Sequence, residues 1–317
     1  MKAFITGIGG QDGSYLAELL ISKGYEVFGL TKKDTDLWRL KDIKKQIHLY
    51  CFNNLDRQGL QNIINEVKPD EIYHLASNVD ARVDLSSEEE IFKSGFEMGY
   101  YILRSAIELK IKPKIYMAGS SLMFGRSKDK VQTEQTVMEP NTPYGISKVA
   151  LYNFLKMYRE VYGIYACMGF LYNHESIRRD EFFLPRKITM SAARIKYGRQ
   201  KNLILGDINV KRDWSAAEDV VISMWMMLQK QKPEDYIVAS GELHSIKDIL
   251  QIVFDELNLD WKDYVQTDKS LIRKIEYTAP KPNPERIFSE LGWKPKILFN
   301  ELILEMLRND LELLRNS

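Results

Sequence analysis

The sequence has 317 residues, with 45 lysines and arginines against 44 aspartates and glutamates, and two cysteines. This length permits a large core in one or two domains. The near-zero net charge excludes the positive field typical of proteins that bind nucleic acid or anionic membranes. Cys51 and Cys167 fit no metal-binding or redox spacing, so we expect neither a disulfide framework nor a metal site. No apolar run has membrane-spanning length, and we expect no signal peptide and a cytoplasmic protein.

The first half of the chain alternates short apolar runs with segments of helical periodicity. Apolar runs without polar alternation predict buried strands at residues 2–6, 25–30, 71–76, 114–120 and 165–173. Helices are predicted at residues 14–24, 60–67, 89–109 and 144–163. Strands and helices that alternate with short connections are typical of a parallel sheet with helices on both faces.

The pattern loosens after about Tyr172, where basic loops, short helices and proline-rich segments such as APKPNP (residues 279–284) follow. We therefore predict an α/β protein with a doubly wound Rossmann sheet in residues 1–172. A smaller C-terminal, substrate-binding lobe is predicted in residues 173–317, with segments that return to the core.

A glycine-rich turn lies between the first predicted strand and the first predicted helix. Gly7, Gly10 and Gly13 follow the strand at residues 2–6. Glycines let backbone N–H groups at a helix N-terminus approach the pyrophosphate of a dinucleotide. The spacing is G-x-x-G-x-x-G, and a turn without a ligand is the alternative interpretation. We predict a cofactor site formed by Gly7, Gly10, Gln11, Asp12, Gly13, Lys32, Asn53, Leu75, Ala76, Tyr144 and Lys148.

The end of the second strand is where such sheets distinguish NAD from NADP. A carboxylate there favours NAD, whereas basic side chains favour the 2′-phosphate of NADP. Here the strand leads into Lys32 and Lys33, followed by Asp34. These charges oppose one another, so the cofactor is predicted as NAD(H) or NADP(H) with the phosphate preference open.

Tyr144 and Lys148 are four residues apart, so they share one face of the helix predicted at residues 144–163. A phenol has a pKa of about 10. A neighbouring ammonium and an oxidised nicotinamide would lower that pKa. Tyr144 is then predicted to exchange a proton with a sugar hydroxyl while hydride moves at the same carbon. An unreactive pair on a surface helix is the alternative.

Two serines end the strand predicted at residues 114–120. Ser120 and Ser121 are placed to hydrogen-bond the same substrate oxygen as Tyr144. We predict Tyr144, Lys148, Ser120 and Ser121 as the catalytic residues.

Three longer motifs carry a specific resemblance. They are TGIGGQDGSYLAELLISKGYEVFG (residues 6–29), NHESIRRDEFFLPRKIT (residues 173–189) and LGDINVKRDWSAAEDVV (residues 205–221). With these motifs the chain resembles the extended short-chain dehydrogenase/reductases that act on nucleotide sugars, and among them the GDP-mannose 4,6-dehydratase family. The resemblance implies hydride transfer from C4, loss of water across C5 and C6, and return of hydride at C6.

Leu122 departs from the family pattern. Family members carry residues like S-T-S-E-L-Y-G after the fourth strand of this pattern, where the glutamate handles the C5 proton and the C6 hydroxyl. This chain has GSSLMFG (residues 119–125), and a leucine neither donates nor accepts a proton. The residues therefore favour oxidation or reduction at C4 over dehydration. Asp80 and Asp84 are the carboxylates that we consider as replacements, although polar loop residues at a strand end are the simpler interpretation.

Basic residues follow Tyr172, and a nucleoside diphosphate requires local cations. The resemblance implies substrate binding by Asn173, Glu175, Arg178, Arg179, Arg186, Lys187 and Arg212, although isolated arginines are often only solvated charges. His174, beside Glu175, is interpreted as a hydrogen-bonded structural residue or as a catalyst.

Other departures concern the base and the substrate loop. Ala279 and Pro282 stand where the family has an arginine and a glutamate near the nucleotide. Ile177 replaces a proline and Asp180 a glycine. Asn78, near the sugar side, also differs from the family. Guanine recognition is therefore less secure than phosphate recognition.

The leading prediction is an NAD(P)-dependent enzyme that transfers hydride at C4 of a GDP-linked sugar, a manno-configured hexose or heptose or its 4-keto form. Nucleotide-sugar and surface-polysaccharide biosynthesis would be its context. The alternatives are a GDP-mannose 4,6-dehydratase with a relocated acid–base group and a nucleotide-sugar-binding protein without turnover. The resemblance also implies a homo-oligomer, either a dimer or a tetramer.

Overall fold

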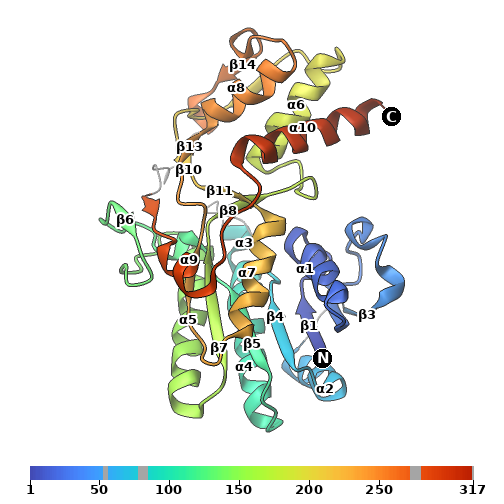
Figure 1. Cartoon of the computed structure of the whole chain (residues 1–317), viewed down its shortest axis with the longest axis vertical. Coiled ribbons are helices and arrows are strands. Elements are labelled where there is room, and N and C mark those ends of the chain that lie inside the picture. Colours follow the sequence, from blue (N-terminus) through green and yellow to red (C-terminus); the bar gives the residue numbers. More distant parts are fainter. Residues whose placement is uncertain (53–55, 78–84, 272–279, 316–317) are drawn as a thin grey trace.

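The structure is a computed structural model that describes residues 1–52, 56–77, 85–271 and 280–315. Its central sheet has seven strands in the order β12-β7-β5-β4-β1-β2-β3, and all neighbouring strands are parallel. The predicted doubly wound α/β sheet is confirmed (Figure 1). The strands are β1 Lys2–Thr6, β2 Glu26–Lys32, β3 Ile47–Phe52, β4 Glu71–His74, β5 Lys114–Ala118, β7 Ala166–Leu171 and β12 Tyr236–Val238.

Helices cover both faces of the sheet because its strands are apolar on both sides. The helices α1 (Gln11–Ser22) and α7 (Ala217–Gln229) bury side chains in the cluster on one face. On the other face, the core is completed by α2 Arg57–Val67, α4 Met98–Glu108 and α5 Pro143–Tyr162. Within the described residues, no helix is both long enough and apolar enough to cross a bilayer.

A second lobe has its own apolar cluster and lies above the sheet in Figure 1. It contains α6 Leu184–Lys196, α8 Ile246–Glu256, α10 Phe299–Arg315, β9 Leu203–Leu205 and β14 Val265–Thr267. The later segments α7, β12 and α9 (Glu285–Leu291) nevertheless lie with the sheet domain. The boundary at residue 172 therefore stays a prediction.

Two strands of the seven-stranded central sheet, β3 and β12, are not predicted by the sequence analysis. The edge strand β3 pairs with β2, but several of its side chains are partly or fully exposed, so it lacks a continuous buried run. The strand β12 has only three residues. Partial burial and short length remove the periodic signal on which strand prediction depends.

The helix predicted at residues 89–109 is interrupted by a π-helical turn. It consists of α3 (Leu85–Phe92), the turn Lys93–Glu97 and α4. A Cβ atom on Gly95 would lie 2.6 Å from Ser147 Oγ, and one on Gly99 would lie 2.6 Å from Leu151 Cδ2. Glycine at both positions therefore lets this segment pack closely against α5, the helix that carries Tyr144 and Lys148.

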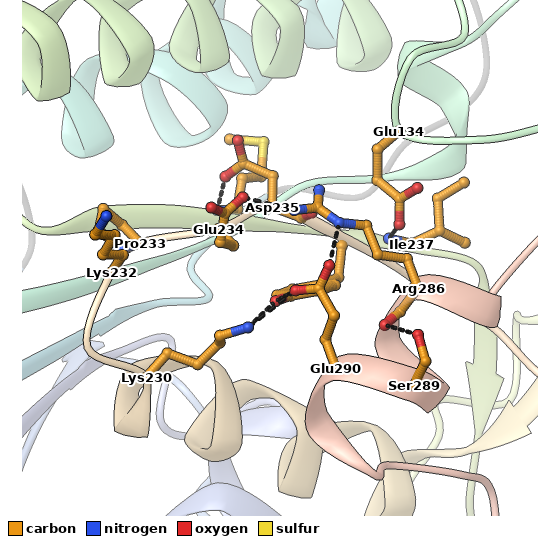
Figure 2. Close-up of polar contacts among 12 residues, drawn as sticks. Glu134, Lys230, Lys232, Pro233, Glu234, Asp235, Ile237, Arg286, Ser289 and Glu290 are labelled. Atoms are coloured by element: carbon orange, nitrogen blue, oxygen red, sulfur yellow. Dashed lines mark hydrogen bonds and ion pairs between the residues drawn. The ribbon is translucent and has the colours of Figure 1, made fainter.

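A buried carboxylate anchors the last strand of the sheet (Figure 2). Asp235, 8% exposed, accepts hydrogen bonds from Arg159 Nη2 at 3.0 Å, Tyr152 OH at 3.1 Å and Met168 N at 2.8 Å. Arg286 of α9 donates to the Asp235 carbonyl at 3.2 Å and forms an ion pair with Glu234 at 2.7 Å. These contacts hold β12 and α9 against α5 and β7.

Replacing Asp235 with alanine should lower the free energy of unfolding by about 2–4 kcal/mol, because it leaves the half-buried Arg159 without its carboxylate. Chemical denaturation of the variant would measure this loss. The control is Glu234→Gln, which removes the neighbouring, more exposed carboxylate and should cost under about 1 kcal/mol. Equal losses in the two variants would contradict the anchoring role of Asp235.

Candidate active site

The carboxyl ends of β1, β4 and β5 meet at one edge of the sheet. Thr6 is in register with His74, and His74 with Met117, so the segments that follow these strands leave the sheet side by side. They are the glycine turn (residues 7–13), residues 75–77 and residues 119–121. Doubly wound sheets bind their ligands at such an edge.

The glycine turn is compact enough to exclude any side chain at its critical positions. Gly7 has φ +75, and a Cβ atom there would lie 2.8 Å from Ala76 N. A Cβ atom on Gly13 would lie 2.6 Å from Ile8 Cα. Helix α1 follows Gly10, which provides no side-chain hydrogen bond to the first-turn N–H groups of the helix. This cradle fits a pyrophosphate group.

Thr6 joins the glycine turn to the segment after β4. Its carbonyl accepts from Leu75 N at 3.2 Å and its hydroxyl from Ala76 N at 3.3 Å. His74 Nδ1 lies 2.8 Å from the same hydroxyl. Burial, aided by the nearby Lys148, lowers the pKa of His74 to about 3, so this imidazole is neutral. The sequence analysis did not single out His74, because nothing distinguishes it within an apolar strand.

Tyr144 and Lys148 lie on one buried face of α5, as predicted. Thr142 caps the helix by accepting from Gly145 N at 3.1 Å, and Pro143 occupies its first turn. Lys148 Nζ lies 5.6 Å from the centroid of the Tyr144 ring. Lys148 is 0% exposed, and its Nζ has no hydrogen-bond partner among the described residues. An unpartnered buried ammonium fits the hydroxyl groups of a bound nucleotide.

The predicted lowering of the Tyr144 pKa does not occur with the protein groups alone. Burial raises the pKa of Tyr144 to about 12, and the neighbouring Ser77 offsets only part of this effect. Burial also lowers the pKa of Lys148 to about 8. Both side chains lose their contact with water on burial, and the interaction between them is weak. Desolvation therefore determines the pKa values of Tyr144 and Lys148.

Ser120 and Leu122 lie beside the first turn of α5. Ser120 caps the short 3-10 helix Ser121–Met123 by accepting from Leu122 N at 3.2 Å. A Cβ atom on Gly145 would lie 2.5 Å from Leu122 O, so a glycine next to Tyr144 permits this close contact. The 3-10 helix after Ser120 therefore packs against the first turn of α5 at Gly145, next to Tyr144, and the catalytic role of Ser120 and Ser121 stays a prediction. Asn78, Asp80 and Asp84, considered at the sugar side, lie outside the described residues.

The side-chain partner of His174 is Asp12 and not the adjacent Glu175. Its Nδ1 lies 2.8 Å from Tyr172 O and its Nε2 lies 2.8 Å from Asp12 Oδ2. Both neighbours are hydrogen-bond acceptors, and this arrangement favours the protonated ring. Burial opposes this charge, but the Asp12 carboxylate outweighs burial and raises the pKa of His174. Burial likewise opposes ionisation of Asp12, yet His174 helps to lower its pKa to about 2.

The predicted substrate arginines are held by partners within the protein. Arg178 donates to Ser14 Oγ at 3.0 Å and to Glu18 Oε1 at 2.6 Å. Two more arginines are paired with carboxylates, Arg179 with Glu175 at 3.1 Å and Arg186 with Asp310 at 2.7 Å. These contacts join residues 178 and 179 to α1 and β8 (Asn173–Glu175), and they join α6 to α10. Binding of phosphate by these three arginines stays a prediction.

The remaining predicted residues lie at more exposed positions. Lys187 donates to Ile204 O at 3.0 Å and Arg212 to Lys211 O at 2.8 Å, whereas Asn173 is exposed at the start of β8. Lys32 forms an ion pair with Glu90 at 2.5 Å and borders an open hollow of about 250 Å³ with Lys33, Asp34, Thr35 and Phe52. Asn53 and Ala279 lie outside the described residues.

Residues 4–306 match the family model described as GDP-mannose 4,6 dehydratase. The chain belongs to the GDP-mannose 4,6-dehydratase family. GDP-mannose 4,6 dehydratase 1 of Arabidopsis thaliana is 41% identical over 329 residues, which cover 99% of this chain and 91% of that protein. GDP-mannose 4,6-dehydratase of Vibrio cholerae is 35% identical, with 98% of this chain and 94% of that protein covered. The predicted family resemblance is therefore confirmed.

Solved structures share the fold at lower sequence identity. UDP-glucose 4-epimerase of Thermotoga maritima with UDP-glucose has a TM-score of 0.87 at 19% identity and covers 99% of this chain and 100% of its own. The dTDP-glucose 4,6-dehydratase of Streptomyces venezuelae, with NAD and TYD bound, has a TM-score of 0.86 at 20% identity, with 98% and 97% covered. RMD of Pseudomonas aeruginosa, complexed with NADPH, has a TM-score of 0.79 at 18% identity, with 98% and 99% covered.

Replacing Lys148 with methionine should stabilise the cofactor-free protein at pH 7 by about 1–3 kcal/mol while abolishing activity. The folded pKa is about 8 against 10.5 for the unfolded group. Between pH 8 and pH 10.5 the Lys148 amine binds more protons in the unfolded state than in the folded state. Lys148 therefore destabilises the fold by its full amount below pH 8, and this destabilisation decreases as the pH rises.

Urea denaturation at pH 7 and at pH 9.5 would measure the difference between variant and wild type. That difference should shrink at the higher pH. Lys156→Met, an exposed lysine two turns along α5, is the control and should show no such pH dependence. A destabilised Lys148→Met variant at pH 7 would contradict the prediction.

Proposed function

We propose that the protein uses NAD(P) to transfer hydride at C4 of a GDP-linked sugar, a manno-configured hexose or heptose or its 4-keto form. The observation that carries the proposal is the buried Lys148 ammonium on the same helix face as Tyr144, close to a glycine cradle for pyrophosphate. Family membership supports a nucleotide sugar as the substrate. It also supports a soluble, cytoplasmic place in nucleotide-sugar and polysaccharide biosynthesis.

The cofactor would be held by residues at both ends of the site. The glycine turn and the first turn of α1 would bind the pyrophosphate, and Lys148 would bind the ribose hydroxyl groups near the nicotinamide. When bound, the oxidised nicotinamide supplies a hydride acceptor and a positive charge. The presence of NAD and NADPH in proteins of the same fold supports this class of cofactor without distinguishing the two.

The protein's own groups would handle the proton at C4. Tyr144 takes the proton of the C4 hydroxyl as hydride leaves the same carbon, and returns it in the reverse reaction. Its pKa of about 12 must fall for this role, and the Lys148 ammonium is the nearest cation on α5. Ser120 hydrogen-bonds the C4 oxygen and holds it against the phenol.

Leu122 is the reason to propose hydride transfer without dehydration. Elimination of water across C5 and C6 needs a group that removes one proton and delivers another, and such assistance is worth roughly 10²–10⁴-fold in rate. Leucine supplies neither function. The second candidate is a 4,6-dehydratase with a relocated acid–base group, and the relatives' names favour it. Binding of a nucleotide sugar without turnover is the third candidate.

Incubation of the purified enzyme with GDP-mannose and NAD⁺ or NADP⁺ separates these candidates. Hydride transfer alone should give a product two mass units lighter and an equivalent of reduced cofactor, measured by mass spectrometry and absorbance. Loss of one water without net cofactor reduction would contradict the proposal and identify a dehydratase. Tyr144→Phe should lower the rate of hydride transfer about 10²–10⁴-fold while the variant still binds cofactor. If neither the wild type nor Tyr144→Phe shows turnover and both bind the ligands equally well, the protein binds a nucleotide sugar without reacting with it.

Leu122→Glu should introduce or increase dehydratase activity, since it restores a carboxyl group beside Tyr144 and Ser120. The same assay would detect the dehydrated product. Leu122→Gln is the matched control, because it has similar size and polarity but no acid–base function. Equal dehydration by the glutamate and glutamine variants would contradict the assignment of residue 122 to the elimination step.

A homo-oligomer also belongs to the proposal. Exposed apolar side chains on α5, Phe154, Met157 and Val161, provide a surface for a second copy. The family resemblance supports a dimer or a tetramer.

A further inference from the structure

We propose that Arg39 is a positioning residue that couples the glycine turn to the substrate loop, here defined as residues 176–183. The inference rests on the proposed function, which assigns the cofactor to the turn, and on the predicted substrate residues, of which Arg178 and Arg179 lie in the loop. Sequence analysis did not predict a role for Arg39, because a single arginine after the second strand is most often a surface charge.

The guanidinium of Arg39 contacts two segments that are far apart in the chain, the glycine turn and the substrate loop. Its Nη1 donates to Gly9 O of the glycine turn at 3.4 Å. Its Nε donates to Arg178 O of the substrate loop at 2.8 Å. Its Nη2 forms an ion pair with the Asp180 carboxylate at 2.5 Å. One planar fork therefore connects the turn directly to the loop.

Burial makes these contacts more than a surface ion pair. The side chain of Arg39 is 8% exposed, whereas that of Asp180 is 53% exposed. The guanidinium stacks on Trp38, with 4.7 Å from its central carbon to the ring centroid. Since a buried guanidinium must keep its partners, movement of the loop or the turn would cost Arg39 part of its hydrogen bonding.

The loop is also attached to the opposite side of the turn. Ser176 Oγ donates to Gln11 Oε1 at 2.9 Å, and Arg178 reaches Ser14 and Glu18 of α1. These contacts hold the start of the loop, whereas Arg39 holds its middle at Asp180. Because Asp180 stands where the family pattern has a glycine, the ion pair is a feature of this chain that family resemblance does not imply.

Cofactor binding should therefore order the substrate loop, and substrate binding should tighten cofactor binding. A dinucleotide fixes the glycine turn, including the Gly9 carbonyl. The Gly9 carbonyl and the loop bind the same Arg39 guanidinium. When cofactor fixes the position of this carbonyl, the free-energy cost of ordering the loop therefore falls. Coupling of this kind must be reciprocal between the two ligands.

Hydrogen–deuterium exchange of the full-length protein tests the coupling directly, with NADPH or NADH as the probe. In the wild type, saturating cofactor should slow amide exchange within residues 176–183. It should also lower the Kd for GDP, measured by calorimetry. Asp180→Asn should reduce this cofactor-dependent tightening about two- to five-fold, and Arg39→Gln should reduce it further.

Glu181→Gln is the matched control. Glu181 adjoins Asp180 in the loop but forms its ion pair with Arg194 of α6, away from the glycine turn. This variant should keep the wild-type response to cofactor. Thermal unfolding of Asp180→Asn should stay close to that of the wild type, which separates lost coupling from lost folding even if Arg39→Gln does not fold.

The outcomes distinguish this inference from the proposed function. The coupling would be overturned if cofactor did not change amide exchange in the wild-type loop. It would also be overturned if cofactor tightened GDP binding equally in Asp180→Asn and the wild type. If cofactor protects the loop as expected but GDP does not bind, the coupling stands and the proposed GDP-linked substrate fails.

Discussion

The ion pair between Asp12 and His174 joins the two halves of the site. Asp12 lies in the first turn of α1, next to the predicted pyrophosphate cradle, and His174 lies in β8, where the chain leaves the sheet domain. The ring is fixed from both sides, by Asp12 and by the Tyr172 carbonyl, so it fixes the orientation of β8. Gln11 adds a bond to the His174 carbonyl at 3.3 Å. The position of Asn173 and of the whole substrate loop relative to the glycine turn depends on this junction.

The predicted catalytic pair shows the opposite arrangement, because the buried Lys148 ammonium has no hydrogen-bond partner among the described residues. Lys148 could have been stabilised by a carboxylate, but such a partner would hold the ammonium away from nucleotide hydroxyls and compete for its charge. A neutral neighbour of the ammonium is the imidazole of His74, whose pKa is lowered to about 3 chiefly by burial. Gly95 and Gly99 allow the packing around it to close. The buried ammonium thus lowers the stability of the cofactor-free protein, and it stays available to bind a ligand.

The sequence predicts the sheet, the glycine turn and the Tyr144–Lys148 face because each depends on local periodicity or on spacing within one element. It fails for β3, which is partly exposed at the sheet edge, and for the short β12. It also fails for the partners of charged side chains. Arg178, Arg179 and Arg186 resemble a free cationic cluster in the sequence, yet each is paired with a carboxylate, two of which come from remote segments. His74 and Arg39 carry no local signal at all, since their importance arises from contacts between distant segments.

The proposed role of residue 122 requires that its side chain can change without changing the fold. The 3-10 helix that carries it is fixed by the Ser120 cap and by the close approach of its backbone carbonyl to Gly145. Neither contact involves the side chain of residue 122, so a leucine and a glutamate should be accommodated by the same backbone. The proposed hydride-transfer groups on α5 are positioned by separate contacts at Thr142 and Gly95. Overall resemblance to dehydratases is therefore compatible with loss of the elimination step, because the elements that define the family likeness do not depend on the side chain that the step requires.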